Sequence, residues 1–211
     1  MKLDTTRLDT TPLQQLVFAA LAAALVLLGW SGPGLLGLMA LVVLWPPAVP
    51  WLPPGFGRVL RSYAVVLPLW GGVLVGYLWA MRALGAPVAP QPVLQQLAAH
   101  GTATEHFLGH CLAIVVLAPL AEEVLFRGYL LAALRVVLPA NVAQVVCAAL
   151  FGLCHGLAYA LPLACLGCWF GWLRLRHGAL LPAVLGHALH NALTVALTVV
   201  WPGHFDWLYA R

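Results

Sequence analysis

The stretch LAIVVLAPLAEEVLFRGYLLAALRVVL, residues 112–138, decides how this chain is interpreted. Its apolar residues are typical of a membrane interior, yet it contains two adjacent acids, Glu122 and Glu123. Only three carboxylates lie between Asp9 and Asp206, and these are two of them. An ionised acid at the centre of a membrane helix costs roughly 2.5–3.5 kcal/mol, so the pair requires partners or a function.

The composition of the whole chain places this stretch in a membrane protein. Of the 211 residues, 63% are hydrophobic and 8% are charged, and the mean hydropathy is +0.96. Soluble domains contain about 25% charged residues, so we predict an all-α fold, a polytopic transmembrane helix bundle. At about 20 residues for each span, the length allows about 7–8 helices. The net charge of +4 comes from scattered basic residues, and nucleic-acid binding is not expected because it requires a clustered basic face.

A stretch rich in proline and glutamine, residues 86–96, divides the chain and is expected to be a flexible connection. Residues 1–90 are predicted to form the N-terminal transmembrane helices, with spans near 14–31, 35–52 and 63–84. The first span is expected to stay uncleaved, because no small-residue cleavage site follows it. Residues 106–201 contain every polar island, meaning each group of polar side chains inside an otherwise apolar stretch. They are predicted to form a helical core, with helices near 107–121, 123–138, 140–160, 162–176 and 179–201.

All five cysteines lie in apolar stretches, and Cys165 and Cys168 form a C-x-x-C pattern within one of them. Free cysteine behaves as a small apolar residue, so we interpret these side chains as packing residues rather than as a redox or metal site.

The two acids of the central stretch are expected to differ in role. Arg127 follows Glu123 by four residues, a spacing that places both on one helical face, where they can form an ion pair. Glu122 is rotated about 100° from its neighbour and has no counter-ion nearby in the sequence. A carboxylate in such a place suits a general acid or base. The alternative is a charge cluster at a helix end in the membrane interface.

Two further polar islands lie in apolar helices. Phe151 and His155 are one turn apart in VCAALFGLCHGLAY, and the imidazole can bind a carboxylate or hold a water against it. His187 and Asn191 share the same spacing, and two donors one turn apart can bind the oxygen that becomes negative when a peptide carbonyl is attacked. His190 lies three residues after His187 and could substitute. The alternative for each is helix packing through interhelical hydrogen bonds.

In this order, and in an apolar chain, the three islands resemble the CPBP family of CAAX proteases and bacteriocin-processing enzymes, also called Abi proteins. The family pattern is EExxxR, then FxxxH, then HxxxN or HxxxD. The resemblance covers about residues 106–201 and extends to the text APLAEEVLFRGYL and HALHNAL around the motifs. The motif positions are filled here by Glu122, Glu123, Arg127, Phe151, His155, His187 and Asn191.

The resemblance implies an intramembrane glutamic endopeptidase that hydrolyses a peptide bond without a covalent intermediate, and it implies no metal and no other cofactor. Glu122 would activate the attacking water, assisted by His155, while His187 and Asn191 would form the oxyanion site. Hydrolysis at membrane depth requires a water-filled cavity within the bundle. The supporting residues that the resemblance implies are Glu123, which would pair with Arg127, and Phe151.

Three other functions remain open at this level. A zinc-dependent membrane protease would use Glu122, His155 and His187 as ligands, an acceptable catalytic set, although H-E-x-x-H is missing. A cysteine transpeptidase of the exosortase kind would use Cys154, but adjacent residues on a helix point about 100° apart, which argues against a dyad with His155. A non-enzymatic immunity or transport protein would use the acids and histidines as a proton relay or binding site. Chelation, thiol alkylation and Glu122→Gln separate these functions.

The expected partners are the lipid bilayer and a membrane-embedded or lipid-anchored protein or peptide substrate. The sequence contains no soluble recognition domain, so the substrate is expected to enter through the bilayer. A bias toward alanine and leucine, with nine tryptophans, suggests a GC-rich bacterium, in which prenylated CAAX proteins are not expected. A leader peptide or a C-terminal sorting tail is therefore favoured as substrate, and the predicted location is the bacterial inner (plasma) membrane, with several spans.

Overall fold

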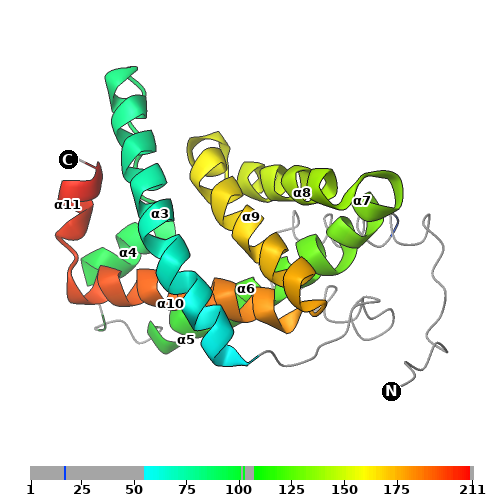
Figure 1. Cartoon of the computed structure of the whole chain (residues 1–211). Helices are drawn as coiled ribbons and strands as arrows, with labels where there is room; N and C mark the ends of the chain where they lie inside the picture. Colours follow the sequence, from blue (N-terminus) through cyan, green and yellow to red (C-terminus); the bar gives the residue numbers. More distant parts are fainter. Residues whose placement is uncertain (1–16, 18–54, 101, 103–106, 210–211) are drawn as a thin grey trace.

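The structure is a computed structural model that describes residue 17, residues 55–100, residue 102 and residues 107–209 (Figure 1). The predicted spans near 14–31 and 35–52 lie outside these residues. Within the described ranges all regular structure is helical, which confirms the predicted all-α class. Four helices in this part are long and apolar enough to cross a membrane, namely Phe56–Ala83, Phe107–Val137, Leu157–His177 and Leu181–Val200.

The helices of the described part follow one another with short connections. They are α3 (Phe56–Ala83), α4 (Pro92–His100), α5 (Phe107–Leu112), η2 (Ala113–Leu117), α6 (Ala118–Glu123), η3 (Val124–Leu130), α7 (Leu131–Val137), α8 (Ala140–Cys154), η4 (Leu157–Tyr159), α9 (Ala160–His177), α10 (Leu181–Val200) and α11 (His204–Tyr209). The residues after 91 were expected to belong to a flexible connection, but they form α4. The helix begins at Pro92. Proline is favoured at the first position of a helix, because its fixed φ suits that turn and its missing N–H is not needed there.

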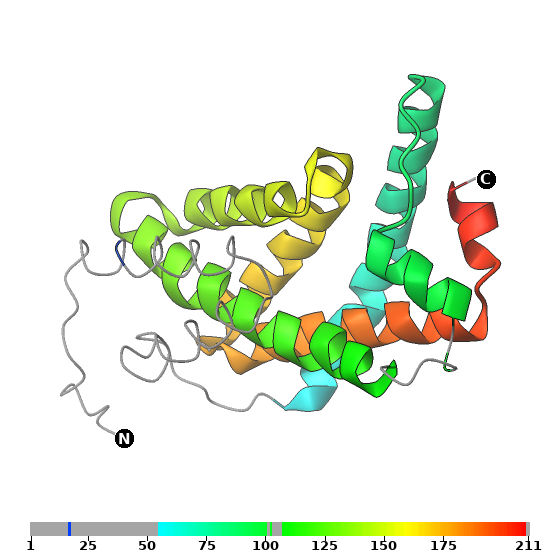
Figure 2. The same ribbon diagram turned by 180° about the vertical axis from the view of Figure 1, so that it is seen from behind.

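The predicted break between a helix near 107–121 and another near 123–138 is wrong. Residues Phe107–Val137 form one continuous helix, seen from behind in Figure 2 as an unbroken line from α5 to α7. Its two π-helical segments, η2 and η3, lie on either side of α6, the short α-helix that ends with the acid pair. Segments of π-helix inside α-helices are frequent at functional sites.

The segment η2 has a physical cause in the proline that follows it. The Ala118 N–H bonds the Ala113 carbonyl, five residues back rather than four. If the five-residue hydrogen-bond spacing continued by one residue, the Ile114 carbonyl would need an N–H at position 119. Residue 119 is proline, which has none. Asn191 of α10 supplies a donor instead, with its Nδ2 atom 2.8 Å from the Ile114 oxygen. The helix therefore passes Pro119 without a break, because a neighbouring helix provides the missing hydrogen bond.

The helices α8 and α9 form a tight hairpin that brings the second motif against the first. The turn uses Gly156, whose φ of 92° lies in the region that favours glycine. The crossing is close at Gly152, where a Cβ atom would lie 2.1 Å from the Ala160 carbonyl oxygen. The predicted helix near 140–160 therefore ends early, at Cys154, and α9 begins at Ala160.

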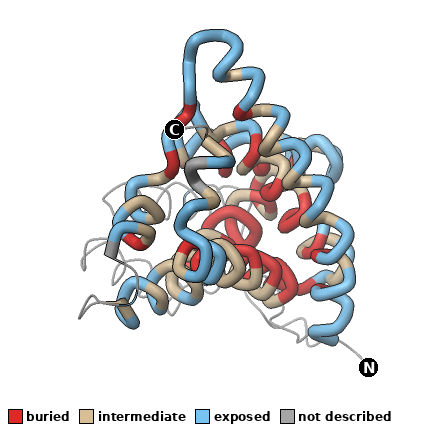
Figure 3. Tube along the Cα trace, turned by 90° about the vertical axis from the view of Figure 1, so that its left-hand side faces the viewer, coloured by how far each residue is buried: buried red, intermediate tan, exposed pale blue. Residues whose placement is uncertain are grey.

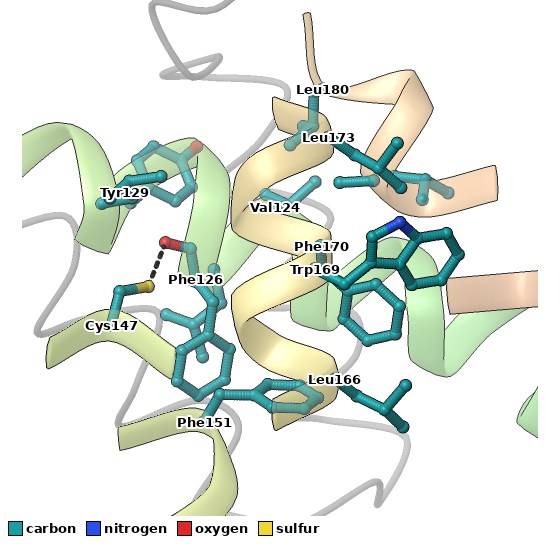
Figure 4. Close-up of a cluster of buried hydrophobic side chains, with 14 of the residues drawn as sticks. Val124, Phe126, Tyr129, Cys147, Phe151, Leu166, Trp169, Phe170, Leu173 and Leu180 are labelled. Atoms are coloured by element: carbon teal, nitrogen blue, oxygen red, sulfur yellow. Dashed lines mark hydrogen bonds between the residues drawn. The ribbon is translucent and has the colours of Figure 1, made fainter. Parts of the chain in front are cut away.

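The core is built where α8, α9, η3 and α10 meet, and Figure 3 shows the buried residues gathered at this centre with exposed ones around them. Figure 4 shows its aromatic part, in which Phe126, Phe151 and Phe170 pack edge to face, and the Cys147 thiol donates to the Phe126 carbonyl at 3.2 Å. Cys147 is 2% exposed, in agreement with its own interpretation as a packing residue.

The outer surface of the described helices is apolar. On α3, Val65, Leu69 and Trp79 are each more than 60% exposed, at 63%, 66% and 67%. Soluble proteins rarely display large contiguous apolar surfaces, whereas lipid-facing helices do so as a rule. Together with the four candidate spans, this surface supports an integral membrane protein.

Candidate active site

The second acid of the pair is buried and forms an ion pair through one of its two oxygens. Glu123 Oε1 lies 2.9 Å from Arg127 Nη1, and both side chains are 0% exposed. The four-residue spacing produces this contact, as the sequence predicted. The same Glu123 oxygen is 2.9 Å from His187 Nδ1 on α10. Glu123 therefore links its own helix to α10.

Arg127 is held on three sides. Its Nη2 atom donates to the carbonyl of Gly167 on α9 at 2.9 Å. Its guanidinium carbon lies 4.6 Å from the Phe151 ring centroid and 5.3 Å from that of Phe170, within the range of cation–π attraction. A Cβ atom at position 167 would lie 3.2 Å from Arg127 Nη2, so only glycine lets the guanidinium approach this backbone freely. Sequence reasoning missed Gly167, because its part depends on a contact across 40 residues.

The first acid has different surroundings. Glu122 Oε2 lies 3.6 Å from His155 Nε2 and 3.9 Å from His187 Nε2. Both distances exceed those of direct hydrogen bonds, so neither imidazole is bonded to this oxygen. Glu122 Oε2 is buried and has no hydrogen-bond partner among the residues that the structure describes. The structure thus brings together the acid and both histidines, one from each of three motifs.

The protons on the two histidines follow from their other partners. His155 Nδ1 lies 2.8 Å from the Phe151 carbonyl, which only accepts, so this nitrogen carries the hydrogen. His187 Nδ1 faces the Glu123 carboxylate and is likewise the donor when that acid is ionised. In each neutral ring the Nε2 lone pair then faces Glu122. The two Nε2 acceptors and the Glu122 carboxylate together suit a ligand that donates hydrogen, such as a water, or a cation.

Phe151 forms the floor of the site. Its ring is 1% exposed and contacts Arg127, His155 and His187, with the two imidazole centroids 4.8 Å and 5.7 Å away. Phe170 stacks on the His187 ring at 4.6 Å with an angle of 16° between the planes. These contacts fix both imidazole rings, so the orientation of the nitrogens toward Glu122 is set by aromatic packing as well as by hydrogen bonds.

Asn191 lies one turn beyond His187 on α10, as predicted, but part of its amide is already used. One hydrogen of Nδ2 is donated to the Ile114 carbonyl in η2. An amide nitrogen carries two hydrogens, so a second donor remains on the same atom. Asn191 therefore supports the backbone of η2 as well as lining the cavity.

A cavity of about 570 Å³ opens onto this arrangement. Its wall includes Glu122, His155, His187 and Asn191, the four residues predicted to be catalytic, together with His190. Most of the remaining wall is apolar and comes from α3, α4, α9, α10 and α11. The described helices thus enclose a cavity at this point, and its largely apolar wall suits an apolar chain.

Other potential chemistry of the described part is limited. No group of three His, Cys, Asp or Glu side chains in the described ranges is arranged to hold a metal ion. Cys154 is exposed at the end of α8, and Cys111, Cys165 and Cys168 are half-buried. None of the five thiols forms an ion pair or a hydrogen bond with a histidine in this part of the chain.

Comparison with known proteins agrees with the sequence motifs. Residues 104–193 match the family model described as type II CAAX prenyl endopeptidase Rce1-like, and the matched segment contains all seven motif residues. This match confirms the resemblance to the CAAX proteases that the motifs predicted. No curated protein and no solved structure matched the chain. The match covers less than half of the chain and shows similarity to this protease family over the segment that contains the motifs.

Proposed function

We propose that this chain, whose segment 104–193 matches the CAAX endopeptidase family, is a glutamic intramembrane endopeptidase. The observation that supports the proposal best is the place of Glu122. Its Oε2 atom lies 3.6 Å from His155 Nε2 and 3.9 Å from His187 Nε2, in the wall of a cavity. A carboxylate so placed can take a proton from a water held between it and an imidazole.

The reaction would begin when a substrate carbonyl enters the cavity beside Glu122. The carboxylate takes one proton of the water as the water oxygen bonds to the carbonyl carbon, and the carbonyl π electrons move to its oxygen. The proton then passes from Glu122 to the amide nitrogen as the C–N bond breaks. His155 would orient the water through Nε2, because its Nδ1–H is bound to the Phe151 carbonyl. Neither step requires a covalent bond to the enzyme.

His187 and Asn191 are proposed to bind the negative oxygen of the tetrahedral intermediate. Asn191 has a second amide hydrogen beside the one that it donates to Ile114. His187 Nε2 is a donor only when its ring carries a second proton, with Nδ1–H on Glu123. Removing one such donor typically costs 10²–10³ in rate in enzymes with an oxyanion site.

Glu123, Arg127 and Phe151 are proposed to support the site without touching the substrate. Both charges are fully buried and cancel, so they contribute orientation rather than reactivity. The proposed division into residues 1–90 and residues 106–201 is compatible with this assignment, because all of these residues lie in the second part. The described end of the first part, α3, packs on α9 and α10 and lines the cavity through Trp70 and Leu74.

The proposed substrate is a leader peptide or a C-terminal sorting tail of a membrane-associated protein in a bacterial inner membrane. The experiment incubates purified protein in detergent with a library of membrane peptides and identifies new termini by mass spectrometry, with and without a chelator. Cleavage that persists with chelator and disappears in Glu122→Gln supports the proposal. A folded wild-type protein that cuts no peptide, while Glu122→Gln changes uptake or resistance in cells, contradicts it in favour of a transport or immunity protein.

A zinc-dependent protease with the same residues is the second candidate. One observation favours it, although in the described ranges these side chains are not grouped as metal ligands. Both histidines present Nε2 to Glu122 while their Nδ1–H groups bind a carbonyl and a carboxylate. Zinc-bound histidines usually have such partners on the second nitrogen. Loss of cleavage on chelation, restored by added zinc, would replace the glutamic mechanism with this one.

A further inference from the structure

His190 is a buried polar residue of α10 that the motif pattern does not use. Its side chain lines the cavity and is 7% exposed. Its Nδ1 atom lies 3.2 Å from the hydroxyl of Tyr63 on α3. The ring also packs against Trp70, edge to face, with the centroids 4.6 Å apart. The neighbouring helix α3 therefore fixes the position of this imidazole.

The Tyr63 contact determines which nitrogen of His190 carries the hydrogen. The Tyr63 hydroxyl has no other hydrogen-bond partner in the described part of the chain. Donation from the hydroxyl to Nδ1 satisfies both groups, and a neutral ring then carries its hydrogen on Nε2. A charged ring is disfavoured, because His190 forms no ion pair with a carboxylate among the described residues and its surroundings are aromatic. His190 thus has an Nε2–H donor without a partner in the described ranges.

The other two donors of α10 differ from His190 in this respect. His187 needs a second proton before its Nε2 can donate, because Nδ1–H is directed to Glu123. Asn191 uses one of its two amide hydrogens on Ile114. Of the two histidines, only His190 keeps an N–H group for a ligand in its neutral form.

We infer that His190 is a substrate-binding residue, whose Nε2–H donates a hydrogen bond to a backbone carbonyl of the peptide in the cavity. The inference rests on the proposed function for its ligand class, a peptide in an apolar cavity. In an apolar site an Nε2–H without an acceptor costs free energy, because it has lost the water that it would otherwise bind. A peptide carbonyl that accepts from this N–H removes that cost. Tyr63 is a positioning residue for the same contact, since it sets both the orientation of the ring and the nitrogen that carries hydrogen.

The test measures binding rather than cleavage, so it does not depend on turnover. All variants are made in a Glu122→Gln background, and the probe is a fluorescein-labelled peptide of sixteen alanines and leucines, with protein and peptide in bicelles. Fluorescence anisotropy gives its affinity. His190→Phe, which keeps a flat ring, is expected to weaken binding about three- to tenfold. Tyr63→Phe is expected to weaken it by a smaller factor, because the ring loses its fixed tautomer. His110→Phe, at an exposed position of α5, is the matched control and should bind as the parent does.

A second series identifies the acceptor. Each backbone amide of the probe is replaced in turn by an ester, whose carbonyl is a weaker acceptor. One ester position should weaken binding to the parent but not to His190→Phe, which is the signature of a direct contact. Equal affinities for His190→Phe and His110→Phe would overturn the inference, as would ester effects that are the same in both proteins. If His190→Phe does not fold, the ester series is compared between the parent and Tyr63→Phe with the same criterion. His190-dependent binding by a protein whose wild type cuts nothing would reject the proposed function and leave this inference in place.

Discussion

Replacing Arg127 by methionine should lower the free energy of unfolding of this protein more than a substitution at its surface does. Arg127→Met keeps the length of the side chain and removes the charge that balances Glu123, which is 0% exposed. Removing one partner of a buried ion pair typically costs about 3–5 kcal/mol, because the other charge stays buried without compensation. The Nδ1–H of His187, 2.9 Å from the same Glu123 oxygen, offsets part of this cost, so we expect the lower end of the range.

The magnitude converts into a measurable shift. For a chain of about 200 residues, 1 kcal/mol corresponds to about 2–4 °C in Tm, which predicts a drop of about 6–12 °C for a loss near 3 kcal/mol. The assay is thermal unfolding in detergent, followed by tryptophan fluorescence. Arg127→Lys should lie between, because one ammonium group does not reproduce the two separate bonds to Glu123 and to the Gly167 carbonyl.

The matched control is Arg61→Met, because Arg61 is exposed on α3 and, among the described residues, bonds the Gly57 carbonyl of its own helix. Exposed substitutions usually change stability by about 0.5 kcal/mol or less, so its Tm should stay within about 2 °C of wild type. Equal Tm values for Arg127→Met and Arg61→Met would refute the reasoning, since they would mean that the buried pair contributes no more than a surface arginine.

Two further substitutions test the packing around the site. Gly152→Ala should lower the free energy of unfolding by about 1–3 kcal/mol, because its Cβ would lie 2.1 Å from the Ala160 carbonyl oxygen. Gly109→Ala is the control, because its Cβ would have nothing within 4 Å, and it should cause no such loss. A Gly152→Ala protein as stable as wild type in unfolding experiments would contradict the close crossing of α8 and α9. Asn191→Leu should cost about 1–3 kcal/mol by leaving the Ile114 carbonyl unpaired. An unchanged Tm for Asn191→Leu would show that the carbonyl finds another donor.

The parts of the site that were predictable are those that depend on local spacing. Glu123 and Arg127 pair because residues four apart share a helical face, and this contact was foreseen. The bond from His187 to Glu123 crosses 64 residues, and no local pattern predicts it. The same holds for Tyr63, which reaches His190 across 127 residues.

The fold shows the same division between local and long-range causes. The all-α class and the apolar spans follow from composition, and they were predicted. The break expected at the acid pair was wrong because Asn191 supplies the hydrogen bond that Pro119 lacks, a compensation that a neighbouring helix provides. The predicted end of the helix after His155 was too late, because the positive φ of Gly156 and the close approach of Ala160 depend on the hairpin.

The central claim is that Glu122 activates the attacking water, and one rate tests it directly. The measurement is the single-turnover cleavage rate of Glu122→Gln relative to wild type, on the best peptide from the library, with thermal unfolding to establish that both proteins are folded. General base catalysis typically contributes 10²–10⁴-fold, so the predicted rate is lower by at least about a hundredfold, with Tm unchanged or raised. Cleavage by folded Glu122→Gln at the wild-type rate would contradict the account and move the search for the base to another residue of the cavity.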